Sequence, residues 1–144
     1  MRKPFVKYPT GSNVFIYVNQ SGSMVPLKEL GRLTKNDDES ARMMLSAIEQ
    51  FAEYDFCEIR KCFSSPFKNH DFNLEIKPQK SCPKVLRIAT LGIPEENFKR
   101  FILLRAFITH GGSKNNVPKK DVDVSDKRAR ECLKWIEENG GVDF

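Results

Sequence analysis

Cationic side chains gather in one stretch of this 144-residue chain. Residues 73–120 carry ten Lys or Arg and three Asp or Glu, a net charge of +7 (10 − 3). Residues 1–72 carry 10 basic and 9 acidic side chains, and residues 121–144 carry 4 and 7. The overall excess of +5 therefore arises in the 73–120 stretch. A local surplus of this kind indicates an anionic partner.

Several of these cations fall on or beside three expected strands. Lys77 and Arg87 lie within strand patterns, a placement that fits either a solvated face or an anion-binding face. Arg105 interrupts the most apolar strand, Phe101–Thr109. It therefore needs an acidic partner such as Glu75 or another acid, or an opening onto a polar cleft, because an unpaired buried charge is costly. The other cations on or next to these strands are Lys80, Lys84, Lys99, Arg100, Lys114, Lys119 and Lys120.

The cysteines do not form a metal-binding pattern. Cys57 and Cys62 are separated by four residues, and no second close pair matches them. Structural zinc sites use two tightly spaced ligand pairs, so we expect no metal. Cys132 falls on the apolar stripe of an expected helix, where a cysteine acts as a small hydrophobic residue. The sequence also lacks a glycine-rich phosphate loop, and we expect no cofactor.

Hydrophobic patterning predicts one domain over residues 1–144, a length that fits a single core. The apolar run Val14–Val18 predicts a buried strand. An amphipathic piece covers Pro26–Leu33, and a helix capped by Asn36 or Asp37 runs to about Tyr54.

The second half of the chain changes to strand periodicity. Strands are predicted over Phe72–Lys77, Lys84–Leu91 and Phe101–Thr109, the last lying centrally because it is almost wholly apolar. Ser125 is predicted to cap a final helix that ends near Asn139. This order predicts an α+β fold, a small curved and mainly antiparallel sheet with helices packed on one side. The basic N-terminus is not followed by an apolar leader, so we expect a cytoplasmic protein with reduced cysteines.

Short motifs follow one another in a fixed order over residues 72–140, about half of the chain. They are Leu74-Glu75-Ile76-Lys77, Val85-Leu86-Arg87-Ile88, Phe101–His110, Val117-Pro118-Lys119-Lys120 and, in the final helix, Ala129-Arg130-Glu131-Cys132-Leu133. This region resembles the toxins of the RelE/ParE superfamily, and within it the HigB-like, phage-derived branch. The sequence departs from that branch at Thr109-His110, where a basic pair is usual, and residues 1–71 match only loosely.

The resemblance implies a RelE-like fold and the toxin of a type II toxin–antitoxin pair, a metal-independent mRNA endonuclease that acts on the ribosome. In such a reaction the RNA 2′-OH attacks the adjacent phosphate, and cations stabilise the developing charge. Arg87 is the candidate phosphate contact, and His110 is the first candidate for proton transfer, with Glu75 or Lys77 second. The candidate RNA-binding residues are Lys80, Lys84, Arg105, Lys114, Lys119 and Lys120.

Two other functions remain open at this point. The ParE-like branch inhibits DNA gyrase without cutting RNA, and fold alone does not decide between the two activities. A catalytically silent nucleic-acid-binding module would also fit the charge of residues 73–120. The expected partners are mRNA, the ribosome and a helix-turn-helix antitoxin encoded by a neighbouring gene, with no membrane.

Overall fold

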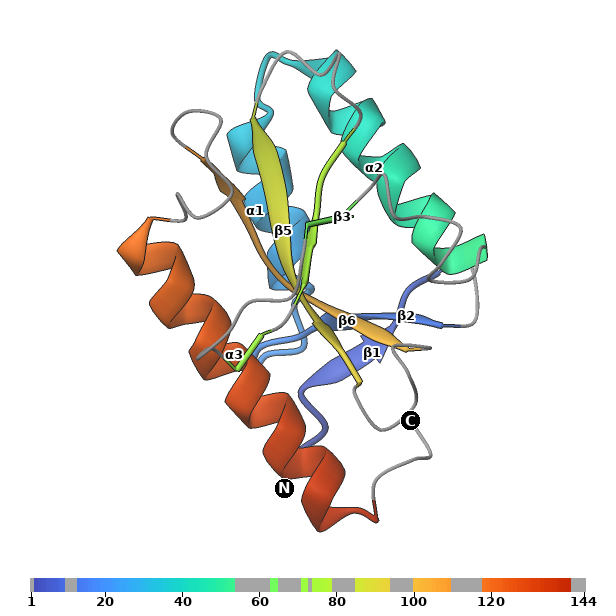
Figure 1. The fold of residues 1–144 in the computed structure, drawn as a ribbon, viewed down its shortest axis with the longest axis vertical. Coiled ribbons are helices and arrows are strands. Elements are labelled where there is room, and N and C mark those ends of the chain that lie inside the picture. The colour runs from blue at the N-terminus through green and yellow to red at the C-terminus, as the bar shows by residue number, and fades with distance from the viewer. Residues whose placement is uncertain are drawn as a thin grey trace.

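A six-stranded sheet and three helices make up the part of the chain that the structure, a computed structural model, describes (Figure 1). That part comprises residues 2–9, 13–53, 63–64, 71–72, 74–78, 85–93, 100–109 and 118–140. The strands are β1 (Phe5–Lys7), β2 (Val14–Tyr17), β3 (Phe63–Ser64), β4 (Leu74–Ile76), β5 (Leu86–Gly92) and β6 (Phe101–Ile108). The helices are α1 (Val25–Leu33), α2 (Asp38–Glu53) and α3 (Lys119–Glu138).

The strands lie side by side in the order β1-β2-β6-β5-β4-β3. Among the described strands, β2 and β6 form a parallel pair and the other neighbours are antiparallel. The predicted α+β class and mainly antiparallel sheet are thus confirmed, and β6 lies inside the sheet as its apolar sequence predicted. The strands β1 and β3 were not predicted, because each has only three or two residues.

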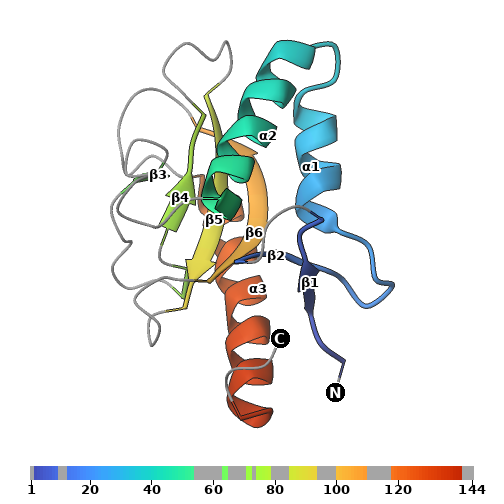
Figure 2. The same cartoon turned by 90° about the vertical axis from the view of Figure 1, so that its right-hand side faces the viewer.

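Both faces of the sheet carry apolar side chains. Along β2, Val14 and Ile16 belong to a core cluster that includes residues of α1 and α2. Phe15 and Tyr17 belong to a second cluster that includes residues of α3. Because successive strand residues point to opposite faces, α1 and α2 cover one side of the sheet and α3 packs on the other. Figures 1 and 2 show α1 and α2 close together, with α3 set apart from them.

The helix boundaries follow from capping chemistry. Asp37 caps α2 as predicted, because its carboxylate accepts the Ser40 amide at 3.1 Å and the Ser40 hydroxyl at 2.7 Å. The predicted cap at Ser125 is wrong, since α3 already begins at Lys119. Pro118 precedes the first turn, and its fixed φ suits that position. Ser125 is buried within α3, where its hydroxyl donates to the carbonyl of Asp121 at 2.6 Å.

Among the described helices, none combines the length and the apolarity needed to cross a lipid bilayer.

Candidate functional site

Strands β4 and β5 place two of the predicted site residues side by side. Glu75 on β4 is opposite Ala89 on β5, and Arg87 lies two residues before Ala89. The ladder to β6 pairs Arg87 with Phe107, which belongs to the cluster beneath α3. Glu75 and Arg87 therefore share the face of the sheet on which α3 packs. Lys77 lies two residues beyond Glu75 and projects to the same face.

A short ion pair joins Arg87 to Glu75. The Nε atom of Arg87 lies 2.7 Å from Oε1 of Glu75, and its Nη1 donates to the carbonyl of Leu86, also at 2.7 Å. The Arg87 side chain is 21% exposed, while that of Glu75 is 3% exposed. A guanidinium has five N–H donors, and among the described residues Glu75 and Leu86 accept two of those of Arg87, so one Nη1 hydrogen and both Nη2 hydrogens have no acceptor there. Arg87 is thus held in place and still able to grip a phosphate.

The buried carboxyl of Glu75 is electrostatically strained. Burial raises its pKa above the ordinary value, and the charges of Arg87 and Lys77 act in the opposite direction. Its Oε2 atom is buried and has no hydrogen-bond partner in the described part of the chain. A buried polar atom without a partner costs free energy, so the position is not optimised for stability alone. Such a carboxyl with a raised pKa beside a cation is a common feature of functional sites.

Arg105 lies in a different environment, at the junction of both helix layers. Its Nη1 atom lies 2.5 Å from Glu29 of α1, and its Nε lies 2.9 Å from Asp121 of α3. Arg128 of α3 contacts the same Glu29 carboxylate at 3.0 Å. Glu29 also accepts the backbone N–H of Ala106 at 3.3 Å. This network, which we call the Glu29 network, consists of Glu29, Arg105, Asp121 and Arg128.

Lys119 and Lys120 are exposed in the first turn of α3. The ion pair between Asp121 and Arg105 fixes this end of the helix over β6. Cations at a helix N-terminus oppose the helix dipole, so they do not stabilise α3. Together with the positive end of the helix dipole, they make this end of the helix attractive to anions.

Comparison with protein-family models, curated proteins and solved structures finds no match to this chain. The resemblance to the RelE/ParE superfamily therefore rests on the motifs of residues 72–140, and what it implies about function is a proposal.

The structure brings three of the four candidate catalytic residues together. Glu75, Lys77 and Arg87 share one face of β4 and β5, and we call them the sheet cluster. The pairing of Glu75 with Arg105, one of the alternatives drawn from the sequence, is wrong, because Glu29 and Asp121 pair with Arg105 instead. The predicted residues outside the described part of the chain are His110, Lys80, Lys84 and Lys114.

The cysteine and metal expectations can be followed only in part. Cys132 is a free, fully buried cysteine, as the apolar stripe of α3 predicted, and burial raises the pKa of its thiol. Cys57, Cys62 and Cys82 lie outside the described residues. Within the described residues, no three His, Cys, Asp or Glu side chains come together as metal ligands would.

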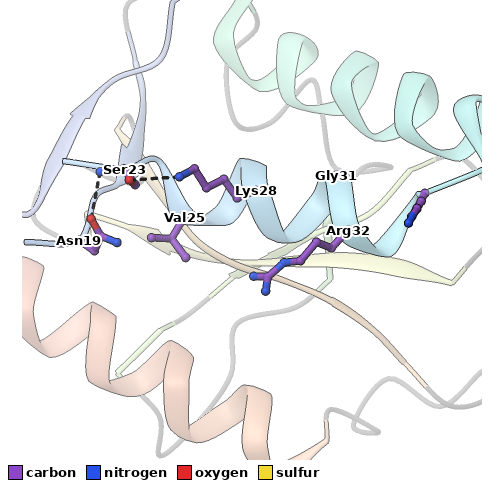
Figure 3. A pocket seen from close by; sticks show the side chains of 7 residues that line it. Asn19, Ser23, Val25, Lys28, Gly31 and Arg32 are labelled. Atoms are coloured by element: carbon purple, nitrogen blue, oxygen red, sulfur yellow. Dashed lines mark hydrogen bonds between the residues drawn. The ribbon is translucent and has the colours of Figure 1, made fainter. Parts of the chain in front are cut away.

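The sequence did not predict two basic cavities in the described part of the chain. Their cations come from residues 1–72 and 121–144, which carry no excess of positive charge like that of residues 73–120. One runs along α1, has a volume of about 660 Å³ and contains Lys28, Arg32 and Lys35 (Figure 3). Their spacing in the sequence, four and then three residues, was the available signal for a shared face, although α1 ends at Leu33 and Lys35 lies just beyond it. The second lies beside the N-terminal segment and α3, with a volume of about 840 Å³. Asn19 contributes to both.

Proposed function

We propose that this protein is the toxin of a type II toxin–antitoxin pair and cleaves mRNA on the ribosome without a metal ion. The observation that carries the proposal is the ion pair between Arg87 and the buried Glu75 within the sheet cluster. It supplies a positioned guanidinium with unused N–H donors in the arginine-bearing strand of the motif series. The RelE/ParE resemblance supplies the class of reaction.

In this mechanism the RNA provides its own nucleophile. The 2′-OH attacks the adjacent phosphorus, a P–O bond to it forms, and the bond to the 5′-oxygen of the next nucleotide breaks. Negative charge grows on the non-bridging oxygens, where the two-pronged donor set of Arg87 and the point charge of Lys77 would stabilise it. The exposed Lys119 and Lys120 on the same side of the sheet would hold neighbouring phosphates.

Glu75 is too deeply buried to touch the RNA directly, at 3% side-chain exposure. We assign it the role of a positioning residue that fixes the guanidinium of Arg87. Removal of the 2′-OH proton then requires a group nearer the surface. His110 follows Thr109 in the sequence, just after β6, and remains the first candidate because of its residue type and sequence position.

Cleavage of a defined mRNA in a translating extract tests the proposal. Arg87→Ala should reduce cutting by at least about a hundredfold, because loss of a transition-state charge contact costs that much. Arg87→Lys should recover only part of it, since a lysine cannot replace a bidentate contact. Arg130→Ala is the matched control, because Arg130 of α3 is a mainly exposed arginine whose ion-pair partner is Asp71.

Two further measurements address the chemistry. Cutting should need no divalent cation beyond the magnesium that the ribosome itself requires, so its rate should stay constant as EDTA lowers free Mg²⁺ to that minimum. A single 2′-deoxy nucleotide at the cut should abolish it. A folded Arg87→Ala variant that cuts as fast as the parent would contradict the assignment of the sheet cluster, as would cleavage of the 2′-deoxy substrate.

The burial of Glu75 favours one second candidate, a ParE-like inhibitor of DNA gyrase. A site whose acid is inaccessible is poorly suited to proton transfer, whereas inhibition by binding needs none. A supercoiling assay with purified gyrase distinguishes the two functions. Inhibition of supercoiling together with intact mRNA would replace the nuclease proposal.

The proposed partner is the antitoxin encoded by a neighbouring gene. An acidic or amphipathic segment of that protein would complement the cationic surface around the sheet cluster. Co-purification of the two gene products, disrupted by high salt, is the expected result.

A further inference from the structure

The cavity beside the N-terminus lies on a different part of the molecule from the sheet cluster. Three segments line it: residues 2–4, the end of β2 with the turn that follows, and one face of α3. Its volume of about 840 Å³ falls in the range of small-molecule binding sites. Its lining residues with ionisable or aromatic side chains are Arg2, Lys3, Tyr17, Lys127, Glu131 and Lys134.

The charge of this cavity is strongly one-sided. Four cations and one acid line it, a net charge of +3 (4 − 1). The acid, Glu131, already accepts a hydrogen bond from the Tyr17 hydroxyl at 2.5 Å. The Tyr17 ring also lies beneath the guanidinium of Arg128, which is 5.1 Å from its centroid. The hydrogen bond from Tyr17 engages one oxygen of the single carboxylate, and the four cations outnumber it, so the cavity is suited to an anion.

Contacts within the protein hold one of these cations in place. The ammonium of Lys3 lies 5.1 Å from the ring centroid of Phe5 and 5.5 Å from that of Trp135. Burial lowers the pKa of this ammonium from its ordinary value, so an incoming anion would relieve an existing cost. A cation held between aromatic rings loses little side-chain entropy when a ligand binds.

The two lysines on α3 define the reach of the ligand. Lys127 and Lys134 are seven residues apart on one face of the helix, a rise of about 10 Å. A single phosphate cannot contact both ends of such a span without the side chains folding towards each other. An elongated ligand with more than one anionic group can.

We propose that this cavity binds a nucleotide that carries two or more phosphate groups. We favour a free nucleotide over a nucleic-acid strand because the volume of about 840 Å³ is the size of a site for one small molecule. The proposal is independent of RNA cleavage, since none of its residues belongs to the sheet cluster.

Isothermal titration calorimetry on the full chain tests the proposal with three probes: ATP, inorganic tripolyphosphate and adenosine. ATP should bind, and its dissociation constant should rise with added salt. Tripolyphosphate should bind at least about tenfold more weakly, since it fills only part of the cavity, and adenosine should not bind. Equal affinity for ATP and tripolyphosphate would overturn the nucleotide assignment, and absence of ATP binding would overturn the site.

Matched variants locate the binding. The double variant Lys127→Gln/Lys134→Gln removes two exposed charges of the cavity and should weaken ATP binding by about tenfold or more. Lys28→Gln/Lys35→Gln removes the same charge from the cavity along α1 and should leave binding unchanged. Equal losses in both variants would contradict this location. Preferential binding of a 5′-phosphorylated oligoribonucleotide over ATP would show that a strand is the ligand.

Discussion

The Glu29 network allows the strongest test of how the two helix layers are joined. Glu29 of α1 is 5% exposed and contacts Arg105 of β6 and Arg128 of α3. Glu29→Gln keeps the shape of this side chain and removes its charge. Both arginines then remain in a half-buried position with an amide in place of a carboxylate.

The structure gives the size of the expected effect. Removing the charge of one partner from a buried ion pair costs about 3–5 kcal/mol, because the other charge loses its counterion. Asp121 still pairs with Arg105, and both arginines are partly exposed, so Glu29→Gln should lower the free energy of unfolding by a smaller amount, about 2–3 kcal/mol. For a domain near this size, that loss corresponds to a fall of roughly 5–10 °C in the melting temperature.

Urea unfolding followed by circular dichroism measures the loss, and Glu137→Gln, on the exposed side of α3, is the matched control. The control should change the free energy of unfolding by no more than about 0.5 kcal/mol, as substitutions at exposed positions usually do. If Glu29→Gln and Glu137→Gln are equally stable, the network does not hold α1 and α3 to β6, and Arg105 is again available as an RNA contact.

Two more predictions concern single carboxylates. Asp37→Ala removes the cap that Ser40 donates to, and should lower the free energy of unfolding by about 1 kcal/mol in urea titration; an unchanged midpoint would show that α2 does not depend on this cap. Glu75 has a raised pKa in the folded state, so folding favours its protonated form, and the stability linked to it falls as pH rises through that pKa. The stability of the parent relative to Glu75→Gln should therefore increase as the pH is lowered from neutral towards the ordinary carboxyl value of 4.5. A difference that stays constant with pH would mean that the carboxyl is not strained.

Sequence periodicity predicted the strands that have a regular alternation of apolar and polar residues or a continuous apolar run. The alternation along β4 and the apolar run of β6 predicted strands, and both belong to the sheet. The start of α3 could not be predicted in the same way. Ser125 has the side chain of a cap, but its hydroxyl bonds to the preceding turn within the helix, as serines in helix interiors also do.

The sequence could predict which residues form the candidate site, but not which acids pair with its arginines. Motif order identified Glu75, Lys77 and Arg87, and their common face follows from strand alternation. The partner of Arg105 could not be found from the sequence, because Glu29 lies on a helix 76 residues earlier. The cavity beside the N-terminus was missed for a similar reason, since its cations come from residues 2–3 and from the acidic C-terminal segment.

The contrast between Arg87 and Arg105 explains why one of two similar residues is suited to bind a ligand. Both lie on inner strands of the sheet, and both are about one-fifth exposed, at 21% and 18%. Arg105 contacts two carboxylates on two helices, and their two negative charges offset its own charge and repel an incoming phosphate. Among the described residues, Arg87 pairs with a single carboxylate, that of Glu75, so less negative charge opposes a phosphate there. An arginine that is oriented by a single buried acid can accept a phosphate without breaking the contact that positions it, and this makes Arg87 the better-founded site for the proposed chemistry.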